Sequence, residues 1–388
     1  MQKLNNIRLL IIKFALLFKA KDYLINSNDK VLLWSFPETD DLMKRSFYQY
    51  YVQKSKHSKF HMFLLNIISV LPLIIFIHKK IENPLIFASR KDNKNKKPVA
   101  LFISYKINLN ILPKSIHEKY NVINIEKISL NGKFINIKDY DSILKEYVLH
   151  PYFLLKTFVK LNYISKLILE YKPSAIINMS EYSFTSSAIT MMCRDNDIRH
   201  INIMHGDKVL TLIDAFFVFD EFYVWHQHYI NLFDTLRSMS SLYIIDYPFT
   251  INNEGNSTGV KRDLVYILQT HTIVQMLRLR KILKKLKKEN NSISIRLHPR
   301  YSFKTIILAI FYDFEIIDPR FESIEDTINS TNQICAINST VLFQATHYNK
   351  EVIIDDISNP RVFNLLARSE YILFKLKHSV LSDLLKKI

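Results

Sequence analysis

The sequence predicts an α/β protein made of two Rossmann-like domains that face each other across a cleft. Apolar, strand-like runs alternate with helical stretches along most of the 388 residues, which is the order of parallel sheets with crossover helices. Polar residues with useful chemistry follow several of these runs, and parallel sheets bind ligands beyond the carboxyl ends of their strands. The chain is also long enough for two well-buried cores.

Composition and charge limit the possible functions. Lys and Arg number 53 against 36 Asp and Glu, a formal net charge of +17, which favours an acidic partner such as nucleic acid, anionic lipid or a phosphorylated substrate. Cys193 and Cys335 lie far apart in apolar surroundings, which indicates free thiols in a cytosolic protein. Only four glycines are present, so a G-x-G-x-x-G dinucleotide loop and a Walker A loop are both excluded.

The N-terminal part contains segments suited to a membrane surface. Met1–Ala20 is amphipathic and lacks the cleavage site of a secretory signal, so we expect a surface or interfacial helix. Val31–Phe36 is expected to be a buried strand. Met62–Ile77 is the most apolar run, but it is shorter than the ~20 residues of a spanning helix and contains Pro72. We expect a buried or monotopic helix there, with flanking lysines near anionic lipid.

Alternating elements fill both halves of the chain. Residues 1–250 are expected to form the first domain and residues 261–388 the second, with the polar stretch Ile251–Val260 as linker. The expected helix Ile273–Glu289 contains the basic segment Arg278–Lys288, whose apolar stripe would either dock on anionic lipid or leave an ordinary solvated face. The expected strands are Val99–Tyr105, Val122–Ile125, Ala175–Met179, Ile201–Met204, Ala215–Phe219, Phe222–Trp225, Leu242–Ile245, Leu264–Leu268, Ser292–Leu297, Phe314–Ile317, Ile334–Asn338 and Val352–Ile354.

Two residues of the first half are candidates for a general base. His205 follows the apolar run INIM and precedes Gly206, so its imidazole lies at a strand exit where a backbone can approach closely. Glu181 lies at the exit of the preceding strand, where a carboxylate would also reach an acceptor hydroxyl. The structural alternative for His205 is a histidine whose hydrogen bonds are satisfied in a turn. The hydroxyl-rich stretch Ser183–Ser187 would form either an anion site or an ordinary helix cap.

Strand ends in the second half indicate a phosphate site. Arg296 and His298 are two residues apart and would share one face of a strand, where a cation and an imidazole suit a diphosphate. Ser339 and Thr340 follow an apolar run and open a helix, so their hydroxyls and the helix amides would bind an anion. Thr270 follows another strand. Together these residues favour a site for a nucleotide diphosphate or monophosphate. The structural alternatives are a histidine in a turn and an ordinary helix cap.

No metal and no cofactor is predicted. The D-x-D pairs at Asp139–Asp141 and Asp195–Asp197 match a pattern of metal-dependent sugar transferases, but neither follows an apolar strand. His226 and His228 lack further ligands at zinc spacing. The basic helix has no aromatic-rich RNA-recognition motif beside it, so nucleic acid is not an expected partner.

The order HG, R-x-H-P and S-T-V-L-F-Q-A, followed by N-K-E-V-I-I, resembles the GT-B glycosyltransferases of bacterial surface-polysaccharide assembly. These include capsule and lipooligosaccharide transferases, sialyltransferases and polysialyltransferases, and CDP-glycerol polymer transferases. The resemblance covers mainly Ala175–Asp356. It implies that His298, Ser339 and Thr340 contact the donor phosphate.

The same resemblance bears on the base. An HG histidine is the base in some relatives, which points to His205, whereas an acidic residue of the N-terminal domain in the sialyltransferase-like ones points to Glu181. The HGD sequence here is not the acidic-acidic-glycine motif of that group, and Gln344 stands where many relatives have Glu.

The resemblance implies a metal-independent glycosyltransferase that moves a sugar from a nucleotide-activated donor to a bacterial cell-surface glycan such as capsule or lipooligosaccharide. CMP-sialic acid is one candidate donor. Residues 1–250 would face the glycan or glycolipid acceptor and an anionic membrane surface, with the enzyme peripheral at the inner face of the cytoplasmic membrane. Residues 261–388 would bind the donor, with Thr270 and Arg296 contributing. Two alternatives remain: a CDP-glycerol or ribitol-type phosphotransferase on the same fold, and a non-catalytic membrane- or RNA-binding protein.

Overall fold

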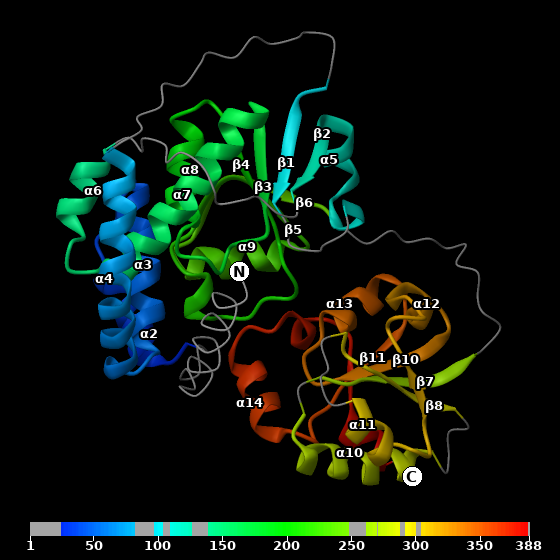
Figure 1. Cartoon of the computed structure of the whole chain (residues 1–388). Helices are drawn as coiled ribbons and strands as arrows, with labels where there is room; N and C mark the ends of the chain where they lie inside the picture. Colours follow the sequence, from blue (N-terminus) through cyan, green and yellow to red (C-terminus); the bar gives the residue numbers. More distant parts are fainter. Residues whose placement is uncertain are drawn as a thin grey trace. The chain divides into compact units, whose positions relative to one another are not determined.

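The computed structural model describes residues 25–81, 97–103, 109–125, 139–247, 261–269, 271–287, 292–299 and 304–386 (Figure 1). The chain divides into two compact units, Met1–His205 with Leu210–Pro248 and Gly206–Val209 with Phe249–Ile388. In the described part of each unit, six strands form one sheet in which every neighbouring pair is parallel. These sheets confirm the predicted α/β class. The segments Met1–Ala20 and Ile251–Val260, and Thr270, lie outside the described residues.

The first sheet has the strand order β2-β1-β3-β4-β5-β6. Its strands are β1 (Val99–Ile103), β2 (Asn121–Ile125), β3 (Ala175–Asn178), β4 (Arg199–Ile203), β5 (Val218–Val224) and β6 (Met239–Ile245). The chain places β2 on one side of β1 and β3 on the other, so the strand order reverses between β1 and β3. Open parallel sheets bind ligands beyond the carboxyl ends of their strands at such a reversal. Glu181 follows β3 and therefore lies close to this point.

Helices cover both faces of the first sheet (Figure 1). They are α2 (Ser27–Ser35), α3 (Leu42–Ser55), α4 (Lys59–Ile81), α5 (Lys114–Lys119), α6 (Tyr140–Glu146), α7 (Pro151–Tyr171), α8 (Ser186–Arg194) and α9 (Gln227–Thr235). Leu101 and Ile176 point to one face, where α3, α4, α7 and α8 complete the larger core. Phe102 and Ile177 point to the other face and pack with α5, because side chains alternate along a strand.

Two strand predictions in this unit are wrong. Val31–Phe36 was expected to be a buried strand, but most of it lies in α2. A capping box starts that helix: Asn26 Oδ1 accepts from the main-chain N–H of Asp29 at 2.9 Å, and Asp29 Oδ2 accepts from that of Asn26 at 3.0 Å. The two strands expected within Ala215–Trp225 are one continuous strand, β5.

α4 is half buried. Met62, Leu73 and Phe76 belong to the larger core, whereas the opposite face of the helix is exposed. Within the described residues it is the one helix long and apolar enough, over Lys59–His78, to cross a membrane by length and composition, and only 28% of its 18-residue apolar window is buried. A fully buried helix, one of the two predicted alternatives, is therefore excluded.

The second sheet has the strand order β12-β11-β10-β7-β8-β9. Its strands are β7 (Arg262–Ile267), β8 (Ile293–Arg296), β9 (Glu315–Ile317), β10 (Thr331–Ala336), β11 (Glu351–Ile354) and β12 (Ser379–Val380). The chain first adds β8 and β9 on one side of β7, and then adds β10, β11 and β12 on the other. The order of this sheet therefore reverses between β7 and β10.

The helices of the second unit are α10 (Ile273–Leu286), α11 (Lys304–Ile310), α12 (Ile324–Asn329), α13 (Thr340–His347), α14 (Pro360–Arg368) and α15 (Leu381–Lys386). The core on one face of the sheet is formed with α10, α11 and α15. The apolar stripe of α10 is buried there, with Leu279, Leu283 and Leu286 almost without exposed surface. This stripe is therefore not available to lipid, and the basic side of α10 is a solvated face.

A fully buried histidine joins four elements of the first unit. His200 on β4 has Nδ1 at 2.7 Å from Thr190 Oγ1 of α8, and Nε2 at 2.8 Å from Asn178 Nδ2 of β3. Thr190 Oγ1 donates to the carbonyl oxygen of Val218 on β5 at 2.6 Å. An amide nitrogen only donates, so Nε2 carries no proton and the ring is neutral. Burial lowers the pKa of His200 from its ordinary 6.5 to about 3.

This neutral histidine predicts acid sensitivity. The pKa of His200 is lower in the folded chain than in the unfolded chain, so between the two values only the unfolded chain binds the proton. The free energy of unfolding therefore falls as the pH drops below the pKa of the unfolded chain. At about pH 5 the loss attributable to His200 should be about 2 kcal/mol relative to neutral pH. Denaturant unfolding of wild type and His200→Gln at both pH values measures it. The free energy of unfolding of the variant should differ less between the two pH values than that of the wild type. If the difference is the same in both proteins, groups other than His200 cause the acid sensitivity.

Candidate functional site

The loop after β3 holds a carboxylate with no exposed surface. Glu181 is fully buried; its Oε2 accepts from Asn202 Nδ2 at 3.0 Å and its Oε1 accepts from the main-chain N–H of His205 at 2.9 Å. Asn202 Oδ1 accepts from the main-chain N–H of Ser180 at 2.8 Å. Because Asn202 lies on β4, these bonds join the loops that follow β3 and β4. Glu181 therefore links the loop after β3 to the loop after β4.

Two glutamines of α3 hold the same loop from the other side. Gln49 Nε2 donates to the carbonyl oxygen of Glu181 at 2.9 Å, and Gln53 Nε2 donates to that of Tyr182 at 3.0 Å. Both amides also donate to the carbonyl oxygen of Ile213, at 2.9 Å and 3.0 Å. The two glutamines are four residues apart and so share one face of the helix. Nothing in the sequence pairs them with a loop so distant along the chain.

The side chain of His205, in contrast, is exposed. Its ring centroid lies 6.5 Å from that of Tyr182 in the adjacent loop, and Tyr182 is also exposed. Of the two candidate bases, His205 is therefore the one with an exposed side chain, whereas the side chain of Glu181 has no exposed surface. Glu181 contacts the main chain of His205 and fixes where that residue lies.

The hydroxyls that follow Glu181 point into the protein. Ser186 and Ser187 are fully buried, and Ser186 Oγ donates to the carbonyl oxygen of Ser180 at 2.6 Å. Ser46 of α3 accepts, through Oγ, from the main-chain N–H of Ala188 at 2.8 Å. The first turn of α8 is therefore covered by α3, which leaves these serines with a structural role.

In the second unit, a side-chain amide lies at the reversal of strand order. Gln269 follows β7; its Oε1 accepts from the main-chain N–H of Asn338 at 3.1 Å, and its Nε2 donates to the carbonyl oxygen of the same residue at 3.0 Å. This pair of bonds extends the pairing of β7 and β10 beyond the last backbone bonds. It fixes the start of the loop that leads into α13.

Ser339 and Thr340 begin α13 as predicted. Ser339 is the N-cap, and its Oγ accepts from the main-chain N–H of Val341 at 3.3 Å. Thr340 Oγ1 accepts from the main-chain N–H of Asp207 at 3.2 Å. Gly206 has φ +70°, and a Cβ there would lie 3.3 Å from Thr340 Oγ1. The left-handed backbone would strain any other residue there, and the contact of a Cβ with Thr340 Oγ1 would be tight, so both features favour glycine.

A buried polar chain supports the same edge of the sheet. Asp355 is fully buried and accepts, through Oδ2, from the hydroxyl of Tyr266 at 2.6 Å and, through Oδ1, from the main-chain N–H of Ser358 at 2.8 Å. The Tyr266 hydroxyl lies 3.1 Å from His271 Nε2, and His271 Nδ1 donates to the carbonyl oxygen of Gln269 at 2.9 Å. Burial lowers the pKa of His271. These residues, which are not among the predicted site residues, brace the loops after β7 and β11.

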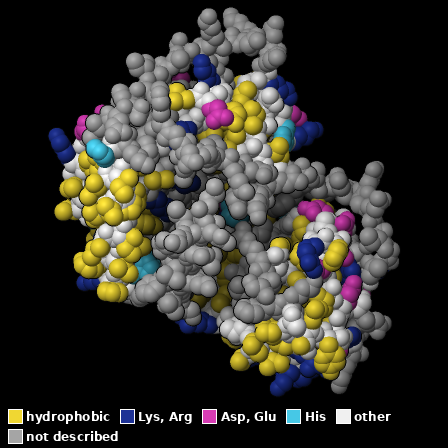
Figure 2. Space-filling view, in the orientation of Figure 1, with side chains coloured by type: hydrophobic (Ala, Val, Ile, Leu, Met, Phe, Trp, Pro, Cys, Tyr) yellow, Lys and Arg dark blue, Asp and Glu magenta, His cyan; other side chains and the backbone are white. Residues whose placement is uncertain are grey.

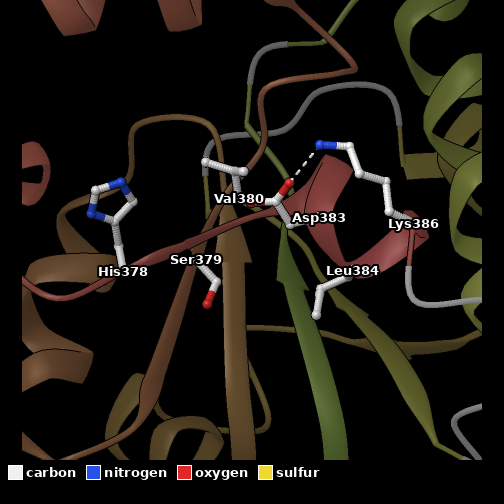
Figure 3. Close-up of a pocket in the computed structure, with 6 residues that line it drawn as sticks. All are labelled: His378, Ser379, Val380, Asp383, Leu384 and Lys386. Atoms are coloured by element: carbon white, nitrogen blue, oxygen red, sulfur yellow. Dashed lines mark hydrogen bonds and ion pairs between the residues drawn. The ribbon is translucent and has the colours of Figure 1, made fainter.

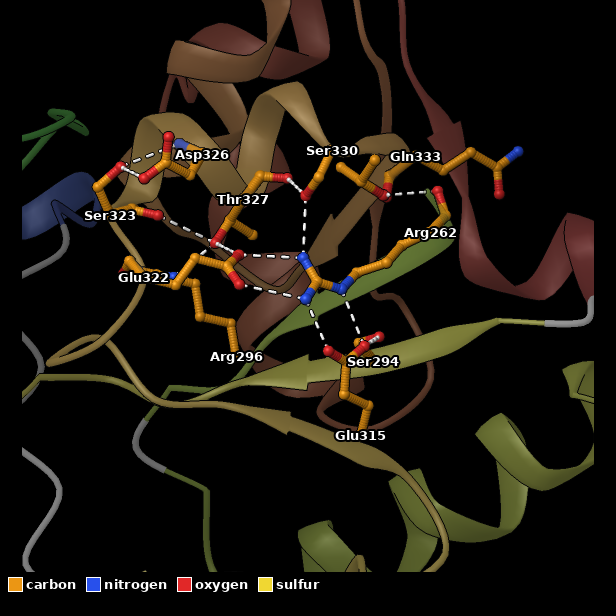
Figure 4. Close-up of polar contacts among 11 residues, drawn as sticks. Arg262, Ser294, Arg296, Glu315, Glu322, Ser323, Asp326, Thr327, Ser330 and Gln333 are labelled. Atoms are coloured by element: carbon orange, nitrogen blue, oxygen red, sulfur yellow. Dashed lines mark hydrogen bonds and ion pairs between the residues drawn. The ribbon is translucent and has the colours of Figure 1, made fainter. Parts of the chain in front are cut away.

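Arg296 and His298 lie in different surroundings. Arg296 is buried; its Nη1 donates to Thr327 Oγ1 at 2.5 Å and its Nη2 donates to the carbonyl oxygen of Glu322 at 2.9 Å (Figure 4). Glu322 also pairs with the buried Arg262 at 3.0 Å. β8 ends at Arg296, so the strand alternation does not extend to His298, which is exposed. The expected shared face of Arg296 and His298 is therefore not formed.

The remaining candidates do not join these groups. Asp139 precedes α6 with φ 57°, and Asp195 ends α8. Within the described ranges, no group of three or more His, Cys, Asp or Glu side chains could hold a metal ion. Cys193 and Cys335 are both buried free thiols.

A shallow depression lies at the outer strand of the second sheet (Figure 3). Its lining includes His378, Leu384 and the ion pair between Lys386 Nζ and Asp383 Oδ1 at 2.8 Å. β12 is the edge strand of this sheet and β11 lies between it and β10, so the depression is not at the reversal of strand order between β7 and β10.

Neither a family model nor a curated protein matches the sequence. Solved structures align over most of the chain at low identity. A Methanocaldococcus jannaschii UDP-GlcNAc 2-epimerase, in complex with UDP-GlcNAc and UDP, is 11% identical over 73% of this chain and 88% of its own, with a TM-score of 0.43. The wall teichoic acid polymerase TagF, soaked with CDPG, is 10% identical over 85% and 88%, with a TM-score of 0.46. The S. aureus MnaA–UDP complex is 12% identical over 66% and 78%, with a TM-score of 0.43. The α/β assignment rests on the strand orders described above.

The burial of Arg296 predicts a structural role. Arg296→Met should lower the free energy of unfolding of the second unit by about 2 kcal/mol, because it removes two hydrogen bonds, one of them to the buried Thr327. Denaturant unfolding measures the loss. Arg320→Met is the matched control, since Arg320 is exposed and pairs with Asp318 at the surface, and it should change little. A stable Arg296→Met protein that binds nucleotide poorly would instead support the predicted contact with the donor.

Proposed function

We propose that the protein is a glycosyltransferase that binds a nucleotide-activated sugar on its second unit. The observation that carries this proposal is the reversal of strand order between β7 and β10, where the Gln269–Asn338 bonds fix the loop that opens α13. Ligands of open parallel sheets bind at such reversals, and the first amides of a helix favour an anion. The phosphates of the donor would lie against Ser339 and the first turn of α13, with His298 as an exposed imidazole on the neighbouring strand exit.

The reaction needs a group that takes a proton from the acceptor hydroxyl. As the acceptor oxygen forms its bond to the anomeric carbon, the bond from that carbon to the donor phosphate breaks, and the nucleotide leaves with the electron pair. His205 would accept the hydroxyl proton, because its side chain is exposed on the first unit. Glu181 would act as a positioning residue through its bond to the main chain of His205. The negative charge gained by the nucleotide would be stabilised by the α13 amides.

The acceptor and the sugar are inferred from chemistry and from the sequence motifs. The net charge of +17 suits a phosphorylated donor and a glycan or glycolipid acceptor at the inner face of the cytoplasmic membrane. CMP-sialic acid is one candidate donor. Transfer of glycerol phosphate or ribitol phosphate from a CDP donor would use the same phosphate site, so a comparison of CMP-, CDP-, UDP- and GDP-linked donors by thermal stabilisation separates the two reactions. Binding of none of them would favour a non-catalytic role.

Ser339 offers a matched test of the donor site. Ser339→Ala and Ser323→Ala each remove an N-cap hydroxyl, from α13 and α12, and each should cost about 1 kcal/mol of stability. Only Ser339→Ala should also weaken binding of the stabilising nucleotide, by about tenfold for the loss of one phosphate contact. Calorimetric titration measures the affinities. Equal affinity in the two variants would place the phosphates elsewhere.

His205 and Glu181 can be separated by the pH dependence of turnover. His205→Gln should lower kcat by about a hundredfold or more and remove the limb of the pH–rate profile that reports the base. In Glu181→Gln the new NH₂ group faces a donor in either orientation, the amide of Asn202 or the main-chain N–H of His205, so the change should lower stability and reduce kcat but leave that limb in place. Steady-state rates across the pH range give both readouts. The opposite pattern would make Glu181 the base.

A further inference from the structure

The outer face of α4 is apolar from Phe60 to Ile75. Phe63, Leu71 and Ile74 expose 61%, 66% and 56% of their surface, and Ile67 and Ile68 are also exposed. Figure 2 shows hydrophobic side chains gathering over α4 and continuing over α2, where Trp34 is exposed. A contiguous exposed patch of this kind marks an interaction surface on a folded protein.

The inner face of the same helix is fixed to the first unit. Phe76 stacks on Phe158 of α7 with ring centroids 6.1 Å apart, and Asn66 Oδ1 accepts from the main-chain N–H of Tyr152 at 3.3 Å. Met62 and Leu73 are buried in the core beside them. The helix therefore cannot turn its apolar face inward without losing this packing.

The distribution of polar groups reverses that of an ordinary surface helix. The polar side chains Asn66 and Ser69 lie toward the protein and donate to carbonyl oxygens of their own helix, at 2.8 Å and 2.7 Å. The outward stripe carries no charged side chain from Phe60 to Ile75. A surface helix normally places polar residues outside, so this one is suited to a non-aqueous contact.

Charge decides between the possible occupants of the stripe. A second copy of the chain would bring together two proteins of net charge +17. Anionic lipid headgroups would instead be attracted by that charge and by the exposed Lys59 and Lys160, on α4 and on the neighbouring α7. Trp34 is of the residue type that lies at the boundary between headgroups and acyl chains.

We propose that α4 lies in the plane of an anionic membrane surface, with its outer stripe at the acyl boundary, and does not cross the bilayer. One face of the helix serves the protein core and the other serves the lipid. This inference does not depend on the proposed function, because neither the donor site nor His205 takes part in it.

Vesicle binding tests the surface. The full chain should co-sediment with vesicles of equal parts phosphatidylcholine and phosphatidylglycerol, and much less with phosphatidylcholine alone. Phe63→Gln with Leu71→Gln should weaken binding to the mixed vesicles at least about tenfold, because two large side chains no longer enter the acyl boundary. Phe321→Gln is the matched control, since Phe321 is 85% exposed in the second unit and lies outside the stripe.

Three outcomes would overturn the proposal: no binding by the wild type, equal loss in the control, or a dimer in solution that the double substitution dissociates. Nucleotide binding measured on the same variants keeps this result separate from the donor site. If donor affinity persists while vesicle binding is lost, only the membrane contact has been removed.

The orientation of α4 has its own test. The single variants Phe63→Cys, Ile67→Cys and Ile74→Cys can each be labelled selectively, because Cys193 and Cys335 are buried. These positions share one side of the helix and span roughly 16 Å along its axis. Quenching by lipids labelled at set depths should report similar depths at all three. A depth that increases steadily along the helix would show a spanning segment and overturn the in-plane arrangement.

Discussion

The structure depends on how the backbone is satisfied where parallel strands end. A ladder of parallel strands leaves N–H and C=O groups without partners at its carboxyl edge, and those groups are costly when buried. In the first unit, Glu181, Asn202 and the α3 glutamines supply the missing partners. In the second unit, Gln269 does the same for Asn338. Because these side chains fix the strand exits, the exposed residues that follow them have defined positions.

The class of fold could be predicted because its signal is local. Strands buried on both faces appear in the sequence as apolar runs, and most of the expected runs are strands. Boundaries and exceptions depend on other forces. Val31–Phe36 has the composition of a strand, but the capping box at Asn26 and Asp29 starts a helix that leaves Val31 and Trp34 exposed. Met62–Ile77 was recognised as a helix, yet its hydropathy alone did not show that one face packs against α7.

The candidate site was only partly predictable for a related reason. Residues that come directly after a strand, such as Glu181, His205 and Ser339, can be found from their position. Whether such a residue is buried or exposed depends on segments far away in the chain. Arg296 and His298 are nearly adjacent, but the end of β8 and the approach of Thr327 separate a buried guanidinium from an exposed imidazole. Gln49 and Tyr266 give no local signal at all.

The proposed membrane contact of α4 would have a kinetic consequence. A glycosyltransferase held in this way would meet a lipid-linked acceptor by diffusion within a surface, so the relevant concentration would be molecules per unit area of membrane. Dilution of the bulk solution would hardly alter that encounter, whereas dilution of the acceptor with other lipids would. Rotation about the membrane normal would remain free, but tilting would be resisted by the length of the helix. The stripe lowers solubility in water. On a membrane it would confine the diffusion of enzyme and acceptor to two dimensions instead of three.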